Sequence, residues 1–342
     1  TRHRTQVNYK YTGPPNNCPN NSETCPNKMA GRKYLSRYRP KYSGAYKGRR
    51  PIRKPYSPRR RSYGKKKYGG KLTKKRILNM TSTKKRDTML TYTNSTSTSQ
   101  SGGTTYSTAL PAIVTGGQAS NAAATFLWCA TARDNTTASS NTRGTVFDAA
   151  CRTSTTPYMV GLKEAIEIQV STGMPWQWRR ICFTFKGPLG LTYDSGTAIA
   201  TETSNGWVRV VNQIAGDPGG GQQYILFEKL FKGQNTSDWN DVMTAKVDNT
   251  RVTLKYDSTV SLASGNEDGF IRKYNRWHSM RKTLVYDDDE LGGASTARTL
   301  STEGKAGMGD YYVLDMFRAR QGSATTDQLS FRPEATLYWH EK

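Results

Sequence analysis

The positive charge of this 342-residue chain is confined to its first quarter. Residues 1–86 contain 27 Lys and Arg but a single acid, Glu23, whereas residues 87–342 contain 24 basic and 25 acidic residues. The formal net charge of +25 therefore comes entirely from the N-terminal segment. This distribution excludes a uniformly basic globule and predicts a nearly neutral folded body, residues 87–342, that carries a cationic arm.

The arm itself has two parts. Residues 1–28 are rich in Asn and Pro and contain few hydrophobic residues, so we expect a polar, disordered extension. Met29 directly precedes the basic run and is a candidate for the native start, with residues 1–28 upstream of it. Residues 29–86 contain 23 Lys and Arg, seven Tyr and no acid. Pro and Gly interrupt any long helix and like charges repel, so we expect this part to be disordered when free.

Dense Lys and Arg suit a phosphate backbone, because each contact releases condensed counterions. Interleaved aromatic rings add stacking on unpaired bases, which tolerates any base sequence. A solvated charge run that only aids solubility is the plainer alternative. The residues that we expect to bind single-stranded nucleic acid, as a set rather than a pocket, are Arg32, Lys33, Arg37, Arg39, Lys41, Lys47, Arg49, Arg50, Arg53, Lys54, Arg59, Arg60, Arg61, Lys65, Lys66, Lys67, Tyr34, Tyr38, Tyr42 and Tyr46.

Clustered basic residues in the same arm also fit a nuclear-import signal, which a host import receptor would read. The two functions can coexist in one segment. The import candidates are Arg59, Arg60, Arg61, Lys65, Lys66, Lys67, Lys74, Lys75, Arg76, Lys84, Lys85 and Arg86.

Beyond the arm, short segments rich in β-branched and aromatic residues alternate with Gly, Asn, Asp and Ser turns. This texture predicts an all-β body of about eight strands, a β-sandwich or jelly roll, with short helices at 223–231 and 236–244. A polar tract at 91–108 reads as a linker or a loosely held first strand. Apolar and polar residues alternate along 176–185 except at Arg179-Arg180, and this interruption suggests a β-bulge within the strand. The expected strands are 125–130, 158–170, 176–185, 207–214, 252–256, 270–286, 311–317 and 335–339.

Motifs for catalysis are missing from the sequence, so we expect no enzyme and no cofactor. His278 has no visible triad and is expected to be a packed or interface residue. Glu164 and Glu167 are three apart on a predicted strand and should face opposite sides. No apolar run is long enough to span a membrane, and no membrane partner is expected. One acidic cluster is a weak candidate for a metal site, because divalent cations bind several carboxylates, and the alternative interpretation is an exposed acidic loop. The cluster consists of Asp287, Asp288, Asp289 and Glu290.

Several motifs resemble a known family. Met29-Ala30-Gly31-Arg32-Lys33-Tyr34 opens an Arg/Tyr-rich arm of the kind found in capsid proteins of small circular single-stranded DNA viruses. Motifs in the body resemble the capsid (coat) protein of genomoviruses, which are gemycircularvirus-like and distantly similar to geminiviruses. These motifs are Arg251–Asp257, Ser264–Asn266, Lys273–His278, Leu284–Glu290 and Leu337–Lys342.

The resemblance implies a single viral jelly-roll domain that self-assembles into a small T=1 icosahedral shell of about sixty copies. It also implies an inward basic arm that packages the circular single-stranded DNA genome, and assembly in the host nucleus to give virions. Two alternatives remain at this point. One is a non-capsid single-stranded nucleic-acid-binding protein that acts as a small oligomer, and the other is an enzyme with a basic targeting arm.

Overall fold

The computed structural model of the chain describes residues 73–101, 103–108, 110–118, 122–137, 142–192, 197–216 and 221–342. All of them belong to one structural unit, Gly69–Lys342. Strands dominate this part of the chain, which contains 17 strands and two helices, and the expectation of an all-β body is confirmed. Neither of the two helices in these ranges is long and apolar enough to cross a membrane.

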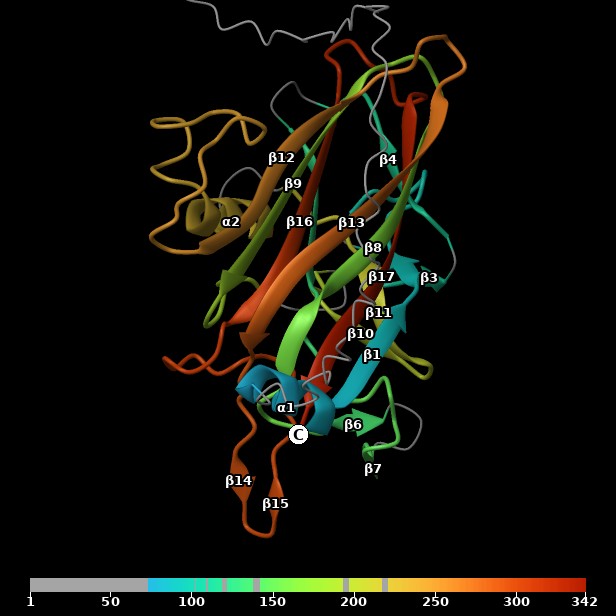
Figure 1. Cartoon of the computed structure of the whole chain (residues 1–342). Coiled ribbons are helices and arrows are strands. Elements are labelled where there is room, and N and C mark those ends of the chain that lie inside the picture. Colours follow the sequence, from blue (N-terminus) through green and yellow to red (C-terminus); the bar gives the residue numbers. More distant parts are fainter. Residues whose placement is uncertain are drawn as a thin grey trace, which may run out of the picture. The chain divides into compact units, whose positions relative to one another are not determined.

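Five strands form the first large sheet (Figure 1). They are β1 (Thr83–Met89), β4 (Ala112–Thr115), β8 (Tyr158–Val170), β13 (Phe270–Thr283) and β17 (Gln328–Glu341). Their order is β1-β17-β8-β13, and β4 pairs with the other end of β17. Every pairing in this sheet is antiparallel.

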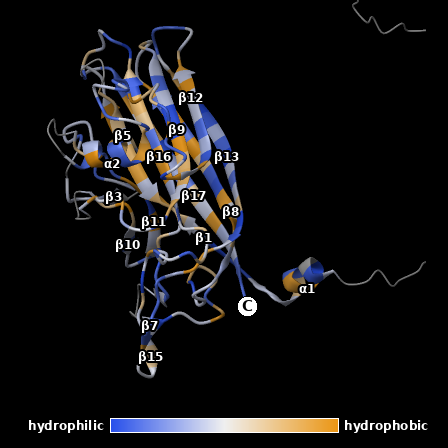
Figure 2. Ribbon diagram, turned by 90° about the vertical axis from the view of Figure 1, so that its left-hand side faces the viewer, coloured by the Kyte–Doolittle hydropathy of each residue, from blue (hydrophilic) through white to orange (hydrophobic). Residues whose placement is uncertain are grey.

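The second large sheet has the order β12-β9-β16-β5 and is also antiparallel. Its strands are β5 (Ala124–Cys129), β9 (Trp176–Phe185), β12 (Thr253–Leu262) and β16 (Asp310–Ala319). Figure 2 shows β5 and β16 as largely hydrophobic, whereas β13 at the edge of the first sheet is largely hydrophilic. The predicted strands at 158–170 and 176–185 coincide with β8 and β9.

Shorter strands complete the structure. A third sheet has the order β10-β11-β2-β3, in which β11 runs parallel to β2. Two small hairpins, β6–β7 and β14–β15, lie at the same end of the unit as helix α1 (Figure 1). The bounds are α1 Lys74–Thr81, β2 Thr91–Thr93, β3 Ser107–Thr108, β6 Thr136–Thr137, β7 Thr142–Arg143, β10 Thr201–Thr203, β11 Gly206–Val211, β14 Glu290–Leu291 and β15 Ala294–Ser295.

The core lies between the two large sheets, because alternate residues of each strand point toward the other sheet. In β8, Ile166 and Ile168 face this core, and their neighbours Ala165 and Gln169 are exposed. Phe317 of β16 and Phe331 of β17 meet across it with ring centroids 4.8 Å apart. Because side chains alternate between the two faces of a strand, one face of the first sheet is buried in the core. The other face, which we call the open face, is exposed to solvent.

The slip in alternation at Arg179-Arg180 is not a bulge, and that expectation is wrong. β9 pairs with β16 in an unbroken register, and the irregularity lies in β12, between Leu254 and Tyr256. β9 is buried on both faces, so apolar residues occupy both parities of the strand. Arg180 points between the sheets, whereas Arg179 on the opposite face pairs with Asp257 at 2.7 Å.

A buried ionic cluster connects the two large sheets to β11. Arg180 contacts Glu164 of β8 at 2.6 Å and Asp315 of β16 at 2.7 Å. Arg209 of β11 contacts the same two carboxylates at 3.3 and 3.1 Å. Burial raises the pKa of Glu164, but Arg180, with His278 and Arg209, lowers it more, and it lies well below its usual range. Two cations and two anions therefore balance in a site closed to water.

This cluster also fixes the faces of β8. Glu164 is fully buried and Glu167 is partly exposed, which confirms that the two carboxylates face opposite sides. His278 is buried, as expected for a packed residue, with Nε2 3.5 Å from Glu164 Oε2. Because Glu164 is anchored inward, the preceding residue, Lys163, is held on the open face of the sheet.

One of the two predicted helices is present. Helix α2 (Gln222–Leu230) confirms the expectation at 223–231, but 236–244 forms turns instead. Thr236 has a positive φ of 69°, and the Asp238 carboxylate accepts a hydrogen bond from the Gln234 N–H at 2.8 Å. Such short polar side chains compete with the helix for the backbone. Trp239 still packs on Phe231, with centroids 5.2 Å apart.

The folded part of the chain begins before residue 87. The expected boundary between 86 and 87 falls inside β1, whose seven residues all pair with β17. The tract at 91–108 is also no linker at its start, because Thr91, Thr93 and Ser95 are buried and β2 pairs with β11. In β1 the alternate residues Lys85, Asp87 and Met89 face inward. Two of these three are charged, so the sequence does not show the alternation of apolar and polar residues that is typical of a half-buried strand.

Candidate nucleic-acid interface

The twenty residues expected to bind DNA lie between positions 32 and 67, outside the described residues, and so do the import candidates from Arg59 to Lys67. Lys74, Lys75 and Arg76 lie in α1. The last three candidates lie in β1, where Lys84 and Arg86 are exposed and Lys85 is buried.

Lys85 is part of the folded body rather than of a free basic run. Its ammonium donates hydrogen bonds to the carbonyl oxygens of Cys151 at 2.8 Å and Thr145 at 3.3 Å, and pairs with Glu341 at 3.4 Å. Glu341 also accepts hydrogen bonds from Thr153 and, at 2.8 Å, from Trp339 Nε1. Lys84-Lys85-Arg86 therefore presents two separated cations to solvent, and Lys85 is not available to an import receptor.

The acidic run from Asp287 to Glu290 does not gather into a metal site. Asp288 turns inward and pairs with the buried Arg152 at 2.5 Å, whereas Asp287, Asp289 and Glu290 are exposed. Burial raises the pKa of Asp288, but hydrogen bonds from Arg152 and the Arg298 N–H lower it overall. Across the described residues, no group of three or more His, Cys, Asp or Glu is placed to hold a metal ion.

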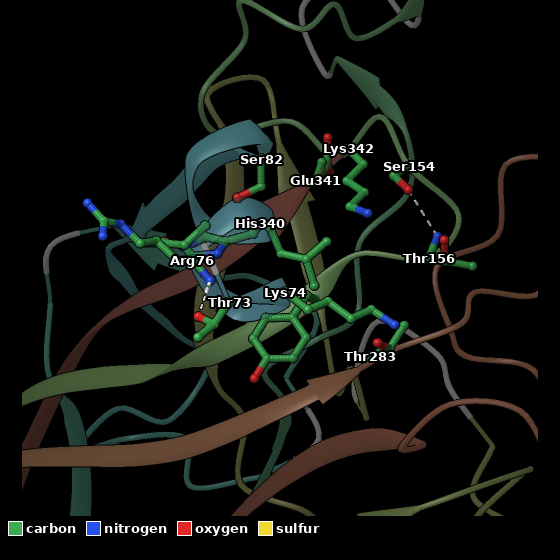
Figure 3. Close-up of a pocket in the computed structure, with 13 residues that line it drawn as sticks. Thr73, Lys74, Arg76, Ser82, Ser154, Thr156, Thr283, His340, Glu341 and Lys342 are labelled. Atoms are coloured by element: carbon green, nitrogen blue, oxygen red, sulfur yellow. Dashed lines mark hydrogen bonds between the residues drawn. The ribbon is translucent and has the colours of Figure 1, made fainter. Parts of the chain in front are cut away.

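A hollow of about 1110 Å³ lies between α1 and the ends of β8, β13 and β17. In Figure 3 the Lys74 side chain crosses it toward Thr283, whereas the Arg76 guanidinium points away. Tyr158 and His340 form part of its wall, with ring centroids 6.3 Å apart. Burial and the charge of Lys84 lower the pKa of His340, which keeps this imidazole neutral near pH 7. Lys74 and Lys342 also line the hollow and make it mildly cationic.

A second hollow, of about 430 Å³, contains several ionisable groups. Arg133 pairs there with Asp87 at 3.1 Å. Glu202 of β10 lines the same hollow, and burial, with the charge of Asp134, raises its pKa to about 7. This carboxyl group can therefore change its protonation state near neutral pH.

The open face of the first sheet carries the surface best suited to nucleic acid. The register places Thr88, Thr336, Lys163 and Trp277 in one row across β1, β17, β8 and β13. The neighbouring row is Arg86, Tyr338, Gly161 and Ser279. Lys84 lies two residues before Arg86 on β1, in the next row on the same face. We give the name open-face patch to the exposed residues Lys84, Arg86, Lys163 and Trp277 together with the half-buried Tyr338.

Charge on the open-face patch is one-sided. Lys84, Arg86 and Lys163 form no salt bridge with any carboxylate in the described ranges. Farther along β13, Lys273 is neutralised by Glu167 at 3.3 Å, and Glu334 is an exposed acid on β17. Cations without a paired acid attract phosphates, and they lie here beside two aromatic rings.

Sequence reasoning places Trp277 in a motif but assigns it no face. Polar residues at alternate positions of β13, namely Lys273, Asn275 and Ser279, are the signal that could have assigned Trp277 to the exposed side.

No known protein-family model matches this chain, and none of the curated proteins matches it either.

Proposed function

We propose that this chain is the coat protein of a small virus with a circular single-stranded DNA genome. It assembles into a T=1 shell of about sixty copies, packages DNA through its basic N-terminal segment, and enters the host nucleus by means of host import receptors. The virion and the host nucleus are its locations. Neither catalysis nor a cofactor belongs to this function.

The strand order of the two large sheets carries the proposal. Numbered along the chain, the eight long strands β1, β5, β8, β9, β12, β13, β16 and β17 lie in the orders 1-8-3-6 and 5-4-7-2. Successive strands thus alternate between the two sheets, except where β9 is followed by β12 within the second sheet. This interleaving is the pattern expected of a jelly roll, an architecture common in viral shells, and we propose that fold for the body.

The division of charge supports a packaging role. Sixty copies of residues 29–86 would bring about 1,400 positive charges inside a shell, enough to offset roughly 1.4 kilobases of single-stranded phosphate. This amount fits a very small genome. The nearly neutral body fits as well, because subunits that contact many neighbours cannot carry a large like charge.

Exposed apolar side chains supply candidate contacts between subunits. Phe147 is 95% exposed and Val146 is 61% exposed, in the loop before Cys151. Leu291 in the β14–β15 hairpin is 66% exposed, and Arg143 of β7 donates a hydrogen bond at 2.7 Å to the Ser295 carbonyl oxygen of that hairpin. An apolar group of this kind at one end of the unit is suited to burial against a second copy.

A second candidate function is a non-capsid single-stranded nucleic-acid-binding protein that acts as a small oligomer. The open-face patch favours it, because an ordered basic and aromatic surface on the body is what such a protein would use. Shell formation separates the two functions, since only the coat protein must close into particles of uniform size.

The test is electron microscopy of the purified full chain, combined with nuclease treatment of any bound nucleic acid. We expect closed particles of one size that protect single-stranded DNA. Monomers or small oligomers with nuclease-sensitive DNA would replace the coat-protein proposal with the second candidate.

A further inference from the structure

Trp277 is an exposed aromatic ring on an otherwise polar strand. Its side chain is 51% exposed, and its ring centroid lies 5.8 Å from that of Tyr338 on β17. β8 lies between these two strands, so the rings approach each other across an intervening strand. The exposed part of the Trp277 ring is an aromatic face on which an unpaired base can stack.

Gly161 of β8 makes this arrangement possible. A Cβ atom at Gly161 would lie 2.7 Å from the Trp277 ring and 2.6 Å from the His278 carbonyl oxygen. The missing side chain therefore leaves room for Trp277 to lie over the strand and reach Tyr338. A residue with a side chain at 161 would displace the ring.

Cations surround the two rings on the same face. Lys163 is directly opposite Trp277 in the register, and Arg86 is directly opposite Tyr338. Neither is paired with a carboxylate among the described residues. Rows of a sheet that share a face are about 6.8 Å apart, so rings and cations alternate over short distances. That combination suits a strand of nucleic acid whose bases are unpaired.

We propose that the open-face patch is a site for unpaired nucleotides, in which bases stack on Trp277 and Tyr338 while phosphates contact Lys163, Arg86 and Lys84. This inference rests on the proposed function and adds to it an ordered contact outside the arm. The basic segment joins the body through α1 and β1, the edge strand of this same sheet, so nucleic acid gathered by the arm is delivered next to the patch. Charge complementarity selects nucleic acid over a second copy of the nearly neutral body.

The experiment is ultraviolet cross-linking of the full chain to a short oligothymidylate, followed by mapping of the modified peptides. We expect cross-links at Trp277 or Tyr338 in addition to those in the arm. Binding of the same oligonucleotide is then measured at high salt, where contacts of the arm are weakened. Trp277→Ala should weaken binding there by about 5- to 150-fold, the range for one lost base stack.

Matched variants separate stacking from general apolar contact. Trp277→Phe should retain much of the affinity, whereas Trp277→Leu should not, because leucine has no ring face. Ile271→Ala is the control, since Ile271 is 66% exposed on the same strand and the same face. Lys163→Gln should weaken binding, whereas Lys273→Gln, whose ammonium is paired with Glu167, should have a much smaller effect. Duplex DNA of equal length should not compete.

Cross-links confined to the arm, with equal affinities for Trp277→Ala and Ile271→Ala, would overturn this inference while particles that protect DNA still form. Loss of particle formation in Trp277→Ala with unchanged oligonucleotide binding would also overturn it, because the face would then be a contact between copies. Absence of particles and of protected DNA in the unmodified chain would instead remove the coat-protein proposal, whatever the cross-links show.

Discussion

The ammonium group of Lys85, in the first strand of the body, lies 3.4 Å from the carboxylate of Glu341, in the last strand, and both side chains are buried. The contact closes the edge of the first sheet, because it fastens β1 to β17 and to the backbone of residues 145 and 151. A residue that composition alone assigns to a DNA-binding arm is thus an anchor of the folded unit.

Lys85→Met should lower the free energy of unfolding by about 3 kcal/mol, because it leaves the Glu341 carboxylate buried without its cation. Thermal or chemical denaturation of the purified chain measures this change. Lys84→Met is the control, since Lys84 is the exposed neighbour on the same strand and should change stability very little. Equal free energies of unfolding for the two variants would show that the buried Lys85–Glu341 pair does not stabilise the fold.

Removal of residues 29–72 should leave a folded body that retains much less DNA, because only the contacts of the open-face patch remain. Removal of residues 29–86 should destabilise the body as well, because it deletes α1, Lys85 and four of the seven residues of β1. Circular dichroism and denaturation compare the two truncated chains, and nuclease protection measures retained DNA. Full DNA retention by the shorter deletion would contradict the role given to the arm.

Asp315→Asn should destabilise the protein by about 3–5 kcal/mol, because Arg180 and Arg209 would then share one carboxylate in a site without water. Trp178 Nε1, which donates a 2.8 Å hydrogen bond to Asp315, would then face a neutral amide instead of a carboxylate. Asp257→Asn is the matched control, since Asp257 pairs with Arg179 but its side chain remains 26% exposed. We expect the control to cost clearly less in the same denaturation experiment.

Glu202→Gln should make the protein more stable at and above neutral pH. The pKa of Glu202 is raised to about 7 by burial and by Asp134, so the folded state holds this proton more tightly than the unfolded state does. Stability of the parent chain therefore falls as pH rises from about 4.5 to 7, and the variant lacks this contribution. Because the group is partly exposed, we expect a difference of about 1 kcal/mol at pH 8 that vanishes near pH 4.5.

The measurement is the free energy of unfolding as a function of pH for both chains. Glu334→Gln removes an exposed carboxylate of β17 and controls for the loss of one charge. A parallel pH dependence of the parent and Glu202→Gln would show that Glu202 titrates like a solvated carboxyl group.

Phe147→Asp should abolish shell assembly without reducing the stability of the isolated subunit. The ring is 95% exposed in the subunit, so a charge there costs nothing until a second copy covers it. Particle yield by sedimentation and unfolding of the unassembled chain give the two readouts, with Phe147→Leu as the conservative control. Normal particles from Phe147→Asp would place the subunit contacts elsewhere.

The long strands could be predicted from the sequence because their composition and length are distinctive. β8 and β9 match their expected ranges, since β-branched and aromatic residues recur along the whole length of both strands. β1 escaped prediction because Lys85 and Asp87, two of its three inward residues, are charged. Only the distant partners Glu341 and Arg133 make their burial favourable, and local sequence does not contain that information.

The candidate site was predictable in its chemistry and not in its position. Charge density in residues 29–86 indicates a phosphate partner, whereas the open-face patch depends on a register that joins β1, β8, β13 and β17. Gly161 illustrates the difference. In the sequence it is one glycine among 31, and only the pairing with Ser279 and Tyr338 shows that it makes room for the Trp277 ring.

The central place of β17 has a consequence for synthesis. β1 and β8 are not neighbours; each pairs with β17, which begins at Gln328. Until β17 has been synthesised, β1 and β8 therefore lack the partner that joins them, and the first sheet cannot close. If the chain is the coat protein that we propose, a copy without β17 would have no closed sheet with which to join a shell.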